Sequence, residues 1–341
     1  MKIYLEDFGL FLGRKRNRFV VRREKERKEF LSDEVESIIC LCKGVSFSAS
    51  AVELAIEKGV HIIFAKYGGW PYAVVMPTSV SGSVKARREQ FLAYNDERGF
   101  ELSVKFIYGK LRNQANLLKL WAKNRRGRDD TTAEELYNAG KKIDEIAAKV
   151  AEKRGTEIEY YRINLMNLEA EAARHYWEAV GEIIPDGYSF PGRVTRGAKD
   201  PVNCMLNLGY QAVLFPEVWK AVAYAGLDPY AGYLHADRPG KPSMVLDLME
   251  EFRQQIVDRV LIRLLTKRVL NPDEVMSPDE PNKLRRKTVQ TLLEKYEGRL
   301  ENTVAYEGRR HHLKSVIHLQ ARGIVRFLIN NTKYQPFIVG W

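Results

Sequence analysis

Two separated blocks of the sequence carry acidic and histidine residues of the types that bind divalent metal ions. The first block, LMNLEAEAARHYW at 165–177, contributes one glutamate, and the second, GYLHADRPGKPSMVLDLMEEFR at 232–253, contributes a histidine and two of its acids. Carboxylates combined with one imidazole suit Mg²⁺ or Mn²⁺, and such an ion can polarise a phosphodiester. In a basic chain, this set favours metal-dependent chemistry on nucleic acid. The four residues are Glu169, His235, Asp247 and Glu250.

A helix is expected to position Glu169, because apolar residues recur at helical spacing from 157 to 182. On that helix Glu169 falls at the edge of the apolar stripe, whereas Glu171 lies further toward solvent. A carboxylate at this edge needs a partner, since burying an isolated charge is costly. The pattern alone leaves two partners open, a metal ion or an arginine.

The second block has an equally simple alternative. Asp247 and Glu250 are three residues apart on a helix expected to start at Pro242 and Ser243, so their side chains share a face. Acids near a helix N-terminus are favoured by the helix dipole and usually face water. His235, in the loop before this helix, could be an ordinary hydrogen-bonded histidine. Judged one by one, these residues favour the non-catalytic interpretation.

Basic residues could hold the phosphates of a nucleic acid. Three of them lie in the loop at 183–200, next to the acid-bearing helices, and there we favour phosphate contact. Three more, at 285–287, are equally well explained as backbone clamps or as a solvated helix end. The cations between 14 and 28 fit DNA contact or protection of a strand edge equally well. The candidate DNA-binding residues are Arg193, Arg196, Lys199, Arg285, Arg286 and Lys287.

The overall charge points in the same direction. The chain of 341 residues has 55 Lys and Arg against 44 Asp and Glu, a formal net charge of +11. Such a balance favours a polyanionic partner, although charge-rich thermophile proteins share it. No apolar run approaches the roughly 20 residues of a membrane span, and the N-terminus does not resemble a secretory signal. We therefore expect a cytoplasmic protein that does not enter the membrane, with its three cysteines reduced.

Periodicity predicts an α+β fold with two unequal parts. Residues 1–79 are rich in short runs of Val, Ile, Phe and Tyr and predict a small β-rich domain with one helix, capped by Ser48 or Ser50 and ended by Gly59. A linker is expected at 80–86, within or beside the segment PTSVSGSV. Residues 87–341 predict a larger, all-α domain that carries the metal site. Its expected helices are 85–97, 101–124, 132–153, 157–182, 201–225, 243–270, 283–297 and 309–331.

Read together, the motifs resemble a known family. The pattern LxxLExEAARxYW, then DPVNCMLNLGYQAVL at 200–214, then the block at 232–253 resembles the CRISPR-associated integrase family, the universal first protein of the spacer-acquisition machinery. The likeness extends to KLRNQANLL at 110–118, QAR at 320–322 and YQPF at 334–337, and so covers most of the chain. One departure is Asn167, where many relatives have glycine; a helix accommodates either residue.

The resemblance implies specific roles. Glu169, His235 and Glu250 are expected to bind the catalytic Mg²⁺ or Mn²⁺, with Asp247 in a supporting position. Without metal, the clustered acids should repel one another, so at least one is expected to have a raised pKa. Two copies are expected to pair through their N-terminal domains and to assemble with the small second CRISPR-associated protein on double-stranded DNA.

The implied reaction is integration. The 3′-hydroxyl of a spacer precursor attacks a phosphodiester at the repeat, and attack by water at the same site gives endonuclease activity. Two alternatives stay open from the sequence: a non-catalytic DNA-binding scaffold of the same fold, and an RNA-directed nuclease.

Overall fold

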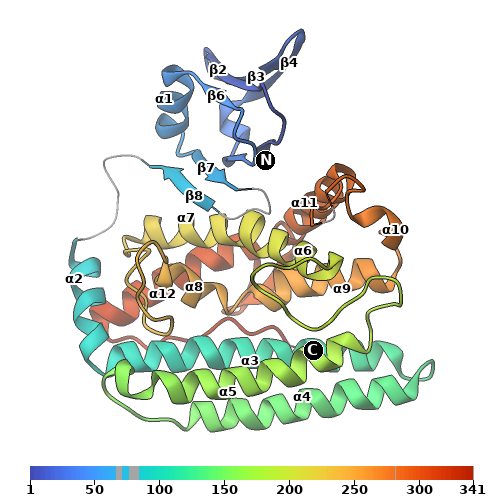
Figure 1. The fold of residues 1–341 in the computed structure, drawn as a ribbon. Coiled ribbons are helices and arrows are strands. Elements are labelled where there is room, and N and C mark those ends of the chain that lie inside the picture. The colour runs from blue at the N-terminus through green and yellow to red at the C-terminus, as the bar shows by residue number, and fades with distance from the viewer. Residues whose placement is uncertain (67–70, 77–83, 281, 341) are drawn as a thin grey trace.

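The computed structural model describes residues 1–66, 71–76, 84–280 and 282–340. A small strand-rich part at the N-terminus stands on a larger helical body (Figure 1). The predicted α+β class, with strands first and helices after, is confirmed. No helix in these ranges is long and apolar enough to cross a membrane.

Two four-stranded sheets form the N-terminal part, in the orders β1-β5-β7-β8 and β4-β3-β2-β6. Their apolar residues share one core that includes Leu12, Phe19, Ile38 and Ile62, together with Leu54 of the helix described next. The strands are β1 (Lys2–Leu5), β2 (Phe11–Lys15), β3 (Arg18–Arg23), β4 (Glu26–Leu31), β5 (Ser37–Cys40), β6 (Ser46–Phe47), β7 (His61–Ala65) and β8 (Pro71–Val75), with a 3-10 turn η1 (Ser32–Glu34) before β5.

The single helix of this part, α1 (Ala49–Glu57), begins and ends where the sequence predicts. Ser48 Oγ accepts a hydrogen bond from the backbone N–H of Ala51, which satisfies one of the free amides of the first turn. Gly59 follows the helix with a φ of +66°, a left-handed conformation that favours glycine.

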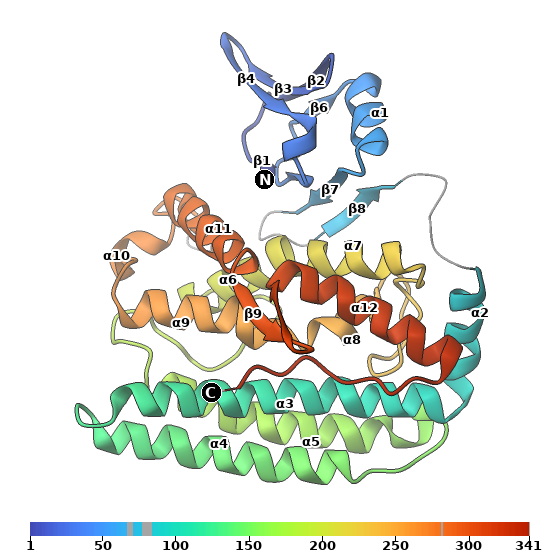
Figure 2. The same ribbon diagram turned by 180° about the vertical axis from the view of Figure 1, so that it is seen from behind.

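Two helical layers make up the larger part (Figures 1 and 2). The long helices α3, α4 and α5 run side by side in the lower layer, and the remaining helices pack above them. One apolar core joins the layers, with Phe106, Tyr176, Leu248, Val257 and Ile324 among its buried members. The helices are α2 (Val84–Leu92), α3 (Glu97–Arg125), α4 (Asp130–Ala151), α5 (Ile158–Gly181), α6 (Pro201–Leu208), α7 (Phe215–Ala225), α8 (Ser243–Met249), α9 (Arg259–Thr266), α10 (Pro272–Val275), α11 (Arg286–Leu300) and α12 (Leu313–Asn330).

Four of the helices expected from the sequence need correction. The helix expected at 85–97 ends at Leu92 and is followed by the 3-10 turn η2 (Ala93–Asn95), because Asp96 caps α3 by accepting from the N–H of Arg98. The helices expected at 201–225 and 243–270 contain π-helical segments, η3 (Gly209–Leu214) and η4 (Gln254–Asp258). Residues 309–312, expected to be helical, form strand β10 (Arg309–His312), which pairs with β9 (Thr303–Tyr306). The larger part is helical, as predicted, with this two-stranded hairpin added to it.

Most of the linker expected at 80–86 lies outside the described residues. Residues 80–83 are not among the described ones, and Val84 to Ala86 belong to α2. The domain division at 1–79 and 87–341 stays a prediction.

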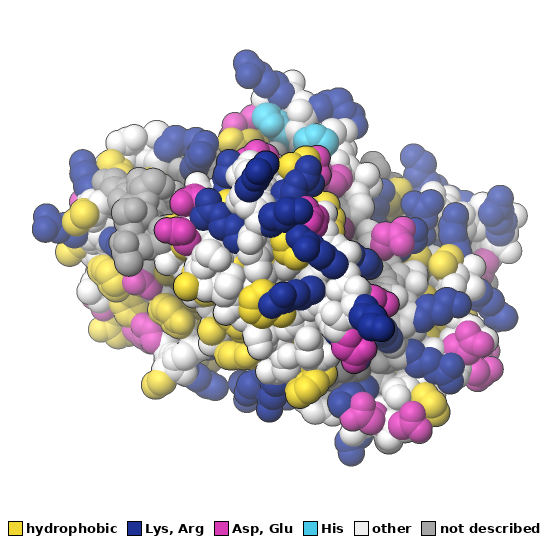
Figure 3. Space-filling view, turned by 90° about the horizontal axis from the view of Figure 1, so that it is seen from above, with side chains coloured by type: hydrophobic (Ala, Val, Ile, Leu, Met, Phe, Trp, Pro, Cys, Tyr) yellow, Lys and Arg dark blue, Asp and Glu magenta, His cyan; other side chains and the backbone are white. Residues whose placement is uncertain are grey.

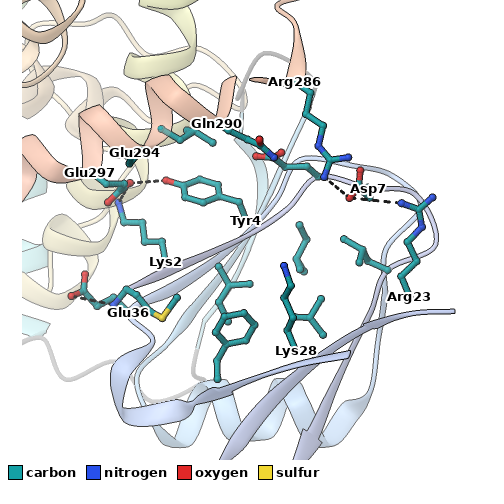
Figure 4. Close-up of a pocket in the computed structure, with 18 of the residues that line it drawn as sticks. Lys2, Tyr4, Asp7, Arg23, Lys28, Glu36, Arg286, Gln290, Glu294 and Glu297 are labelled. Atoms are coloured by element: carbon teal, nitrogen blue, oxygen red, sulfur yellow. Dashed lines mark hydrogen bonds and ion pairs between the residues drawn. The ribbon is translucent and has the colours of Figure 1, made fainter. Parts of the chain in front are cut away.

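Buried ion pairs join the N-terminal part to the helical body. Lys2 Nζ lies 3.0 Å from Glu217 Oε1 of α7. It also lies 2.8 Å from Glu297 Oε1 of α11, to which Tyr4 donates as well (Figure 4). Burial alone would raise the pKa of Glu217, but the positive charges of Lys2 and Lys220 lower it to about 2. Lys2, Tyr4 and Glu297 line a cavity of about 640 Å³ between β1, β4 and α11.

Candidate active site

Three helices bring one lysine and two glutamates together. Lys110 comes from α3, Glu169 from α5 and Glu250 from the end of α8. The Lys110 ammonium forms an ion pair with Glu169 Oε1 and lies 2.7 Å from Glu250 Oε2. The side chains of Lys110, Glu169 and Glu250 are 12%, 17% and 4% exposed, so the cluster is shielded from most solvent. The two glutamates that the sequence pairs with one metal ion thus converge on one positive charge.

Asp247 orients His235. The Asp247 side chain is fully buried, and its Oδ2 accepts from the backbone N–H groups of Tyr233 and Leu234, at 2.6 and 3.0 Å. Its Oδ1 lies 2.7 Å from His235 Nδ1 and also accepts from the His235 N–H at 3.0 Å. His235 Nε2 is left facing Glu250, 4.0 Å from Oε1. A carboxylate bound to one ring nitrogen fixes the other for coordination or proton transfer.

The alternative of a water-facing acid pair is wrong. Asp247 and Glu250 are 0% and 3% exposed, because α8 is covered on this side by the loop that carries His235 and by α3. Gly232 lets the loop that carries His235 pack closely on α8, because a side chain there would meet the backbone of Ser243 and Met244 and the Asp247 carboxylate.

Cations around Glu250 determine its charge. Burial by itself raises the pKa of Glu250, but Arg253, Lys110 and His235 more than offset burial and lower it to about 2. Arg253 Nε donates to Glu250 Oε1 at 3.0 Å. The expected repulsion among acids is therefore wrong for Glu250, since the sequence pattern does not show that Lys110 and Arg253 lie against it.

The side-chain atoms of Glu169, Glu250 and His235 are of the types that bind a divalent cation. Glu250 Oε2 is buried and has no hydrogen-bond partner, since its contact with Lys110 is an ion pair without hydrogen-bond geometry. Two carboxylates and the free Nε2 of His235 are donors that Mn²⁺ accepts, and the carboxylates also suit Mg²⁺. In the conformation described for residues 1–66, 71–76, 84–280 and 282–340, no three His, Cys, Asp or Glu side chains are grouped to hold a metal. Lys110 instead stands between Glu169 and Glu250.

A pocket of about 750 Å³ opens over Glu250 and His235. Trp177 and Phe190 form apolar walls, with ring centroids 6.0 Å apart. The lining has more positive than negative side chains. Its cations are Lys110, Arg174, Arg193 and Arg253, and its acids are Glu178 and Glu250. Such a pocket suits an anionic substrate with a flat or apolar portion.

Two asparagines fix Arg193 on the pocket wall. Asn203 and Asn207 lie one turn apart on α6, and their Oδ1 atoms accept from Arg193 Nη1 and Nη2 at 2.8 and 2.7 Å. Arg193 and Arg253 also lie over the Tyr210 ring, at 5.4 and 4.8 Å from its centroid. These contacts preorganise two guanidinium groups, which bind phosphate well in such fixed geometry.

The other predicted DNA-binding residues lie elsewhere. Arg196 and Lys199 are exposed in the same loop but do not line this pocket. Arg285 donates to the Met276 carbonyl at 2.8 Å, and Arg286 pairs with Asp7 of the N-terminal part (Figure 4). Lys287 is exposed at the start of α11.

Sequence reasoning missed Lys110, Arg253, Asn203 and Asn207 as members of the site. A signal existed for two of them, since asparagines four residues apart share a helix face. Lys110 had no such signal, because its partner Glu169 is 59 residues away along the chain.

Positive charge is also abundant outside this pocket. The view onto the N-terminal part shows Lys and Arg side chains gathered across its centre, with fewer acids among them (Figure 3). Some cations of the N-terminal part are paired: Arg14 contacts Glu53 and Glu57, and Lys15 contacts Glu29.

Comparisons with known proteins agree with the motifs. A family model described as CRISPR associated protein Cas1 matches residues 3–298. The CRISPR-associated endonuclease Cas1 1 of Archaeoglobus fulgidus is 35% identical over all of both chains. The CRISPR-associated endonuclease Cas1 of Korarchaeum cryptofilum is 31% identical over 96% of this chain and 94% of its own.

Solved structures share the fold. A casposase bound to integration product has a TM-score of 0.83 at 21% identity, over 98% of this chain and 92% of its own. A Cas1 protein from Thermotoga maritima has a TM-score of 0.77 at 22% identity, over 100% of this chain and 99% of its own. The resemblance inferred from the motifs is confirmed: this chain belongs to the Cas1 family of CRISPR-associated proteins.

Proposed function

We propose that this protein is a metal-dependent DNA integrase and endonuclease of CRISPR spacer acquisition. The observation that carries the proposal is the convergence of Glu169 and Glu250 on one positive charge, with His235 Nε2 facing Glu250, beneath a basic pocket. The relatives' names support the coarser part, since the two relatives named above are called CRISPR-associated endonucleases.

Glu169, His235 and Glu250 would hold Mg²⁺ or Mn²⁺. When bound, such an ion stabilises the negative charge that gathers on phosphodiester oxygens during displacement. Asp247 keeps His235 Nδ1 engaged, so that Nε2 stays available. Arg253 and Lys110 keep Glu250 ionised at neutral pH. Arg193, held by its two asparagines, would bind a neighbouring phosphate.

The reaction is a transesterification at phosphorus. The 3′-hydroxyl of a spacer precursor releases its proton to solvent as its oxygen forms the new bond to phosphorus. The bond to the 3′-oxygen of the repeat strand breaks, and that leaving oxygen takes up a proton, so no net proton is gained or lost. Water in place of the 3′-hydroxyl gives cleavage at the same site. One structural neighbour is a casposase bound to integration product, which agrees with this reaction class.

The proposed partners are double-stranded DNA, a second copy of the chain and the small second CRISPR-associated protein. Neighbouring structures include a Cas6-RT-Cas1–Cas2 complex and a TtCas1–DNA complex. We assign dimer formation to the N-terminal part. Arg196, Lys199 and residues 285–287 are candidates for DNA contact outside the pocket.

A strand-transfer assay tests the proposal, with a 3′-hydroxyl donor duplex, a repeat-bearing target and Mn²⁺. We expect joined product with the native chain and none with Glu169→Gln, while both bind duplex in a gel shift. If the native chain neither joins nor cleaves DNA and Mn²⁺ does not raise its melting temperature, the DNA-binding scaffold is the better description. Preferential cleavage of RNA in a competition between labelled duplex and RNA would favour the RNA-directed nuclease.

A further inference from the structure

A second basic surface lies between α9 and α11, away from the pocket described above. The two helices lie side by side in both views of the ribbon (Figures 1 and 2). On α9 and its C-cap, cations recur every four residues, and α11 contributes two more at the same spacing. Residues four apart share a helix face, so the two rows face one groove. The groove has a volume of about 650 Å³, and its cations are Arg259, Arg263, Lys267, Lys295 and Arg299.

These cations are poorly compensated. Glu294 is the one acid among the residues described as lining the groove, and it pairs with Lys295 at 3.0 Å. Within the described parts of the chain, no carboxylate forms an ion pair with Arg259, Arg263 or Arg299. Like charges held together without counter-charges destabilise a fold unless a ligand offsets them.

Arg299 is the clearest example of a cation in this groove without an anionic partner. Its Nη2 is buried without a hydrogen-bond partner, and its Nε donates to the Gln255 carbonyl at 2.8 Å. Burial and the nearby charge of Arg259 lower the pKa of Arg299 to about 10. Arg259 in turn donates to Gln255 Oε1 at 3.3 Å. The guanidinium groups are thus held in place by Gln255 and lack an anionic partner.

The π-helical segment η4 separates this groove from the pocket. Gln254 lines the pocket and has a buried Oε1 without a hydrogen-bond partner, while the next residue, Gln255, holds the arginines of the groove. The two sites therefore lie on different sides of one helical turn, about 10 Å across. π-helical turns are frequent at functional sites.

We propose that the groove between α9 and α11 binds the sugar-phosphate backbone of the same double-stranded DNA that is held in the pocket. This inference rests on the proposed function for the identity of the DNA. The row from Arg259 to Lys267 spans about 12 Å at 1.5 Å per residue. That length corresponds to a rise of about three to four nucleotide steps along the duplex axis, at 3.4 Å per step. Arginine and lysine without base-directed partners suit backbone contact and not sequence recognition.

The test measures duplex binding by the full-length chain without metal. Arg263 and Lys267 are exposed, so the double variant Arg263→Gln with Lys267→Gln should fold normally. Fluorescence anisotropy with a labelled duplex of about 30 base pairs is followed from about 50 to about 200 mM KCl in EDTA. We expect the double variant to bind the duplex about tenfold more weakly than the native chain at the higher salt. The slope of log affinity against log salt concentration should be smaller in magnitude by about two.

A matched control carries the same charge change on another helix. Lys142 and Lys149 are exposed on α4, which lies at the far side of the lower layer (Figure 1). The variant Lys142→Gln with Lys149→Gln should bind within about twofold of the native chain, because only general attraction is lost. Equal losses in both double variants, or no loss in the groove variant, would overturn the proposal. So would a groove-dependent preference for single-stranded RNA over the duplex.

Failure of the proposed function would look different. Glu169→Gln in the same titration is expected to keep the native salt slope while losing strand transfer. The native chain could fail to join or cleave DNA while the groove double variant alone shows a smaller salt dependence of duplex binding. In that case the groove proposal stands and the catalytic one fails.

Discussion

Two adjacent glutamates at the end of α8 show how differently neighbouring carboxylates can be used. Glu250 and Glu251 are 3% and 0% exposed. Glu250 faces the pocket and meets Lys110, Arg253 and His235, which together lower its pKa to about 2 despite burial. Glu251 faces the other way, where burial raises its pKa to about 7 against the hydrogen bonds that it accepts. Consecutive helical residues point about 100° apart, so Glu250 and Glu251 enter different environments although they are neighbours in the sequence.

The partners of Glu251 explain its role. Tyr334 Oη, Gln320 Nε2 and the N–H of Phe337 donate to its carboxyl oxygens at 2.6, 2.7 and 2.8 Å. Asn113 adds a second link, since its Nδ2 donates to the carbonyls of Glu251 and Phe337. The C-terminal segment is thereby fastened behind α8. The QAR and YQPF segments, which belong to the family resemblance, therefore support the back of the helix whose front carries Glu250.

The largest effect is expected when the two acids are exchanged for amides. Glu250→Gln should lower strand transfer at least about 1000-fold, because a neutral amide weakens a metal site that supplies several kcal/mol to the transition state. Glu251→Gln should stay within about tenfold, since the amide oxygen can still accept from Gln320 and from the N–H of Phe337, while the amide NH2 can donate to the Tyr334 hydroxyl. Rates are measured with Mn²⁺ at saturating donor DNA. If both variants fold and lose strand transfer to the same extent, the conclusion that Glu250 and Glu251 have different roles is wrong.

Removing the lysine between the acids should expose their repulsion. Lys110→Met leaves Glu169 and Glu250 without the charge that joins them, and breaking such a buried pair costs about 3 kcal/mol. We expect a lower free energy of unfolding in EDTA, measured by urea titration. Mn²⁺ should then raise the melting temperature of Lys110→Met more than that of the native chain, because no ammonium competes for the two carboxylates. A smaller Mn²⁺ shift in the variant would contradict this competition.

Asp247→Asn should weaken the metal site without removing a proposed ligand. The amide cannot accept from two backbone N–H groups on one oxygen while also holding the His235 ring as a carboxylate does. Loss of such a supporting partner typically lowers activity or metal affinity about 10- to 100-fold. The Mn²⁺ concentration for half-maximal strand transfer should rise. An unchanged Mn²⁺ dependence, with a lower melting temperature alone, would restrict Asp247 to a structural role.

The smallest effect is expected in the pH dependence of stability at Asp258. This buried acid accepts from Tyr176 and Tyr210, and burial raises its pKa to about 6. The folded state therefore binds more protons than the unfolded state between the ordinary carboxyl pKa and about 6, and stability falls as pH rises through this window. Asp258→Asn should remove up to about 2 kcal/mol of this dependence between about pH 4 and about pH 7. Urea titrations at both values measure it, and identical pH profiles would show that Asp258 is not the group responsible.

Local patterns were sufficient for much of the fold. The α1 cap at Ser48 and its end at Gly59 follow from side-chain oxygens and backbone freedom within a few residues. The long helices α3, α4 and α5 follow from apolar spacing. The β10 strand was missed because residues 309–312 continue a helical pattern into α12, and only pairing with β9 decides their conformation.

The sequence by itself determined which residue types were available for chemistry and on which elements they stand: Glu169 on a helix, His235 in a loop, and the acids on the next helix. It could not determine what faces them, because that depends on packing between distant segments. Tertiary structure alone placed Lys110 between two glutamates from other helices. It also turned Glu251 away from Glu250 and engaged Arg286 of α11 with Asp7 of the N-terminal part. The physical reason is that charge state and role depend on burial and on the opposing charges, and both are properties of the packed chain.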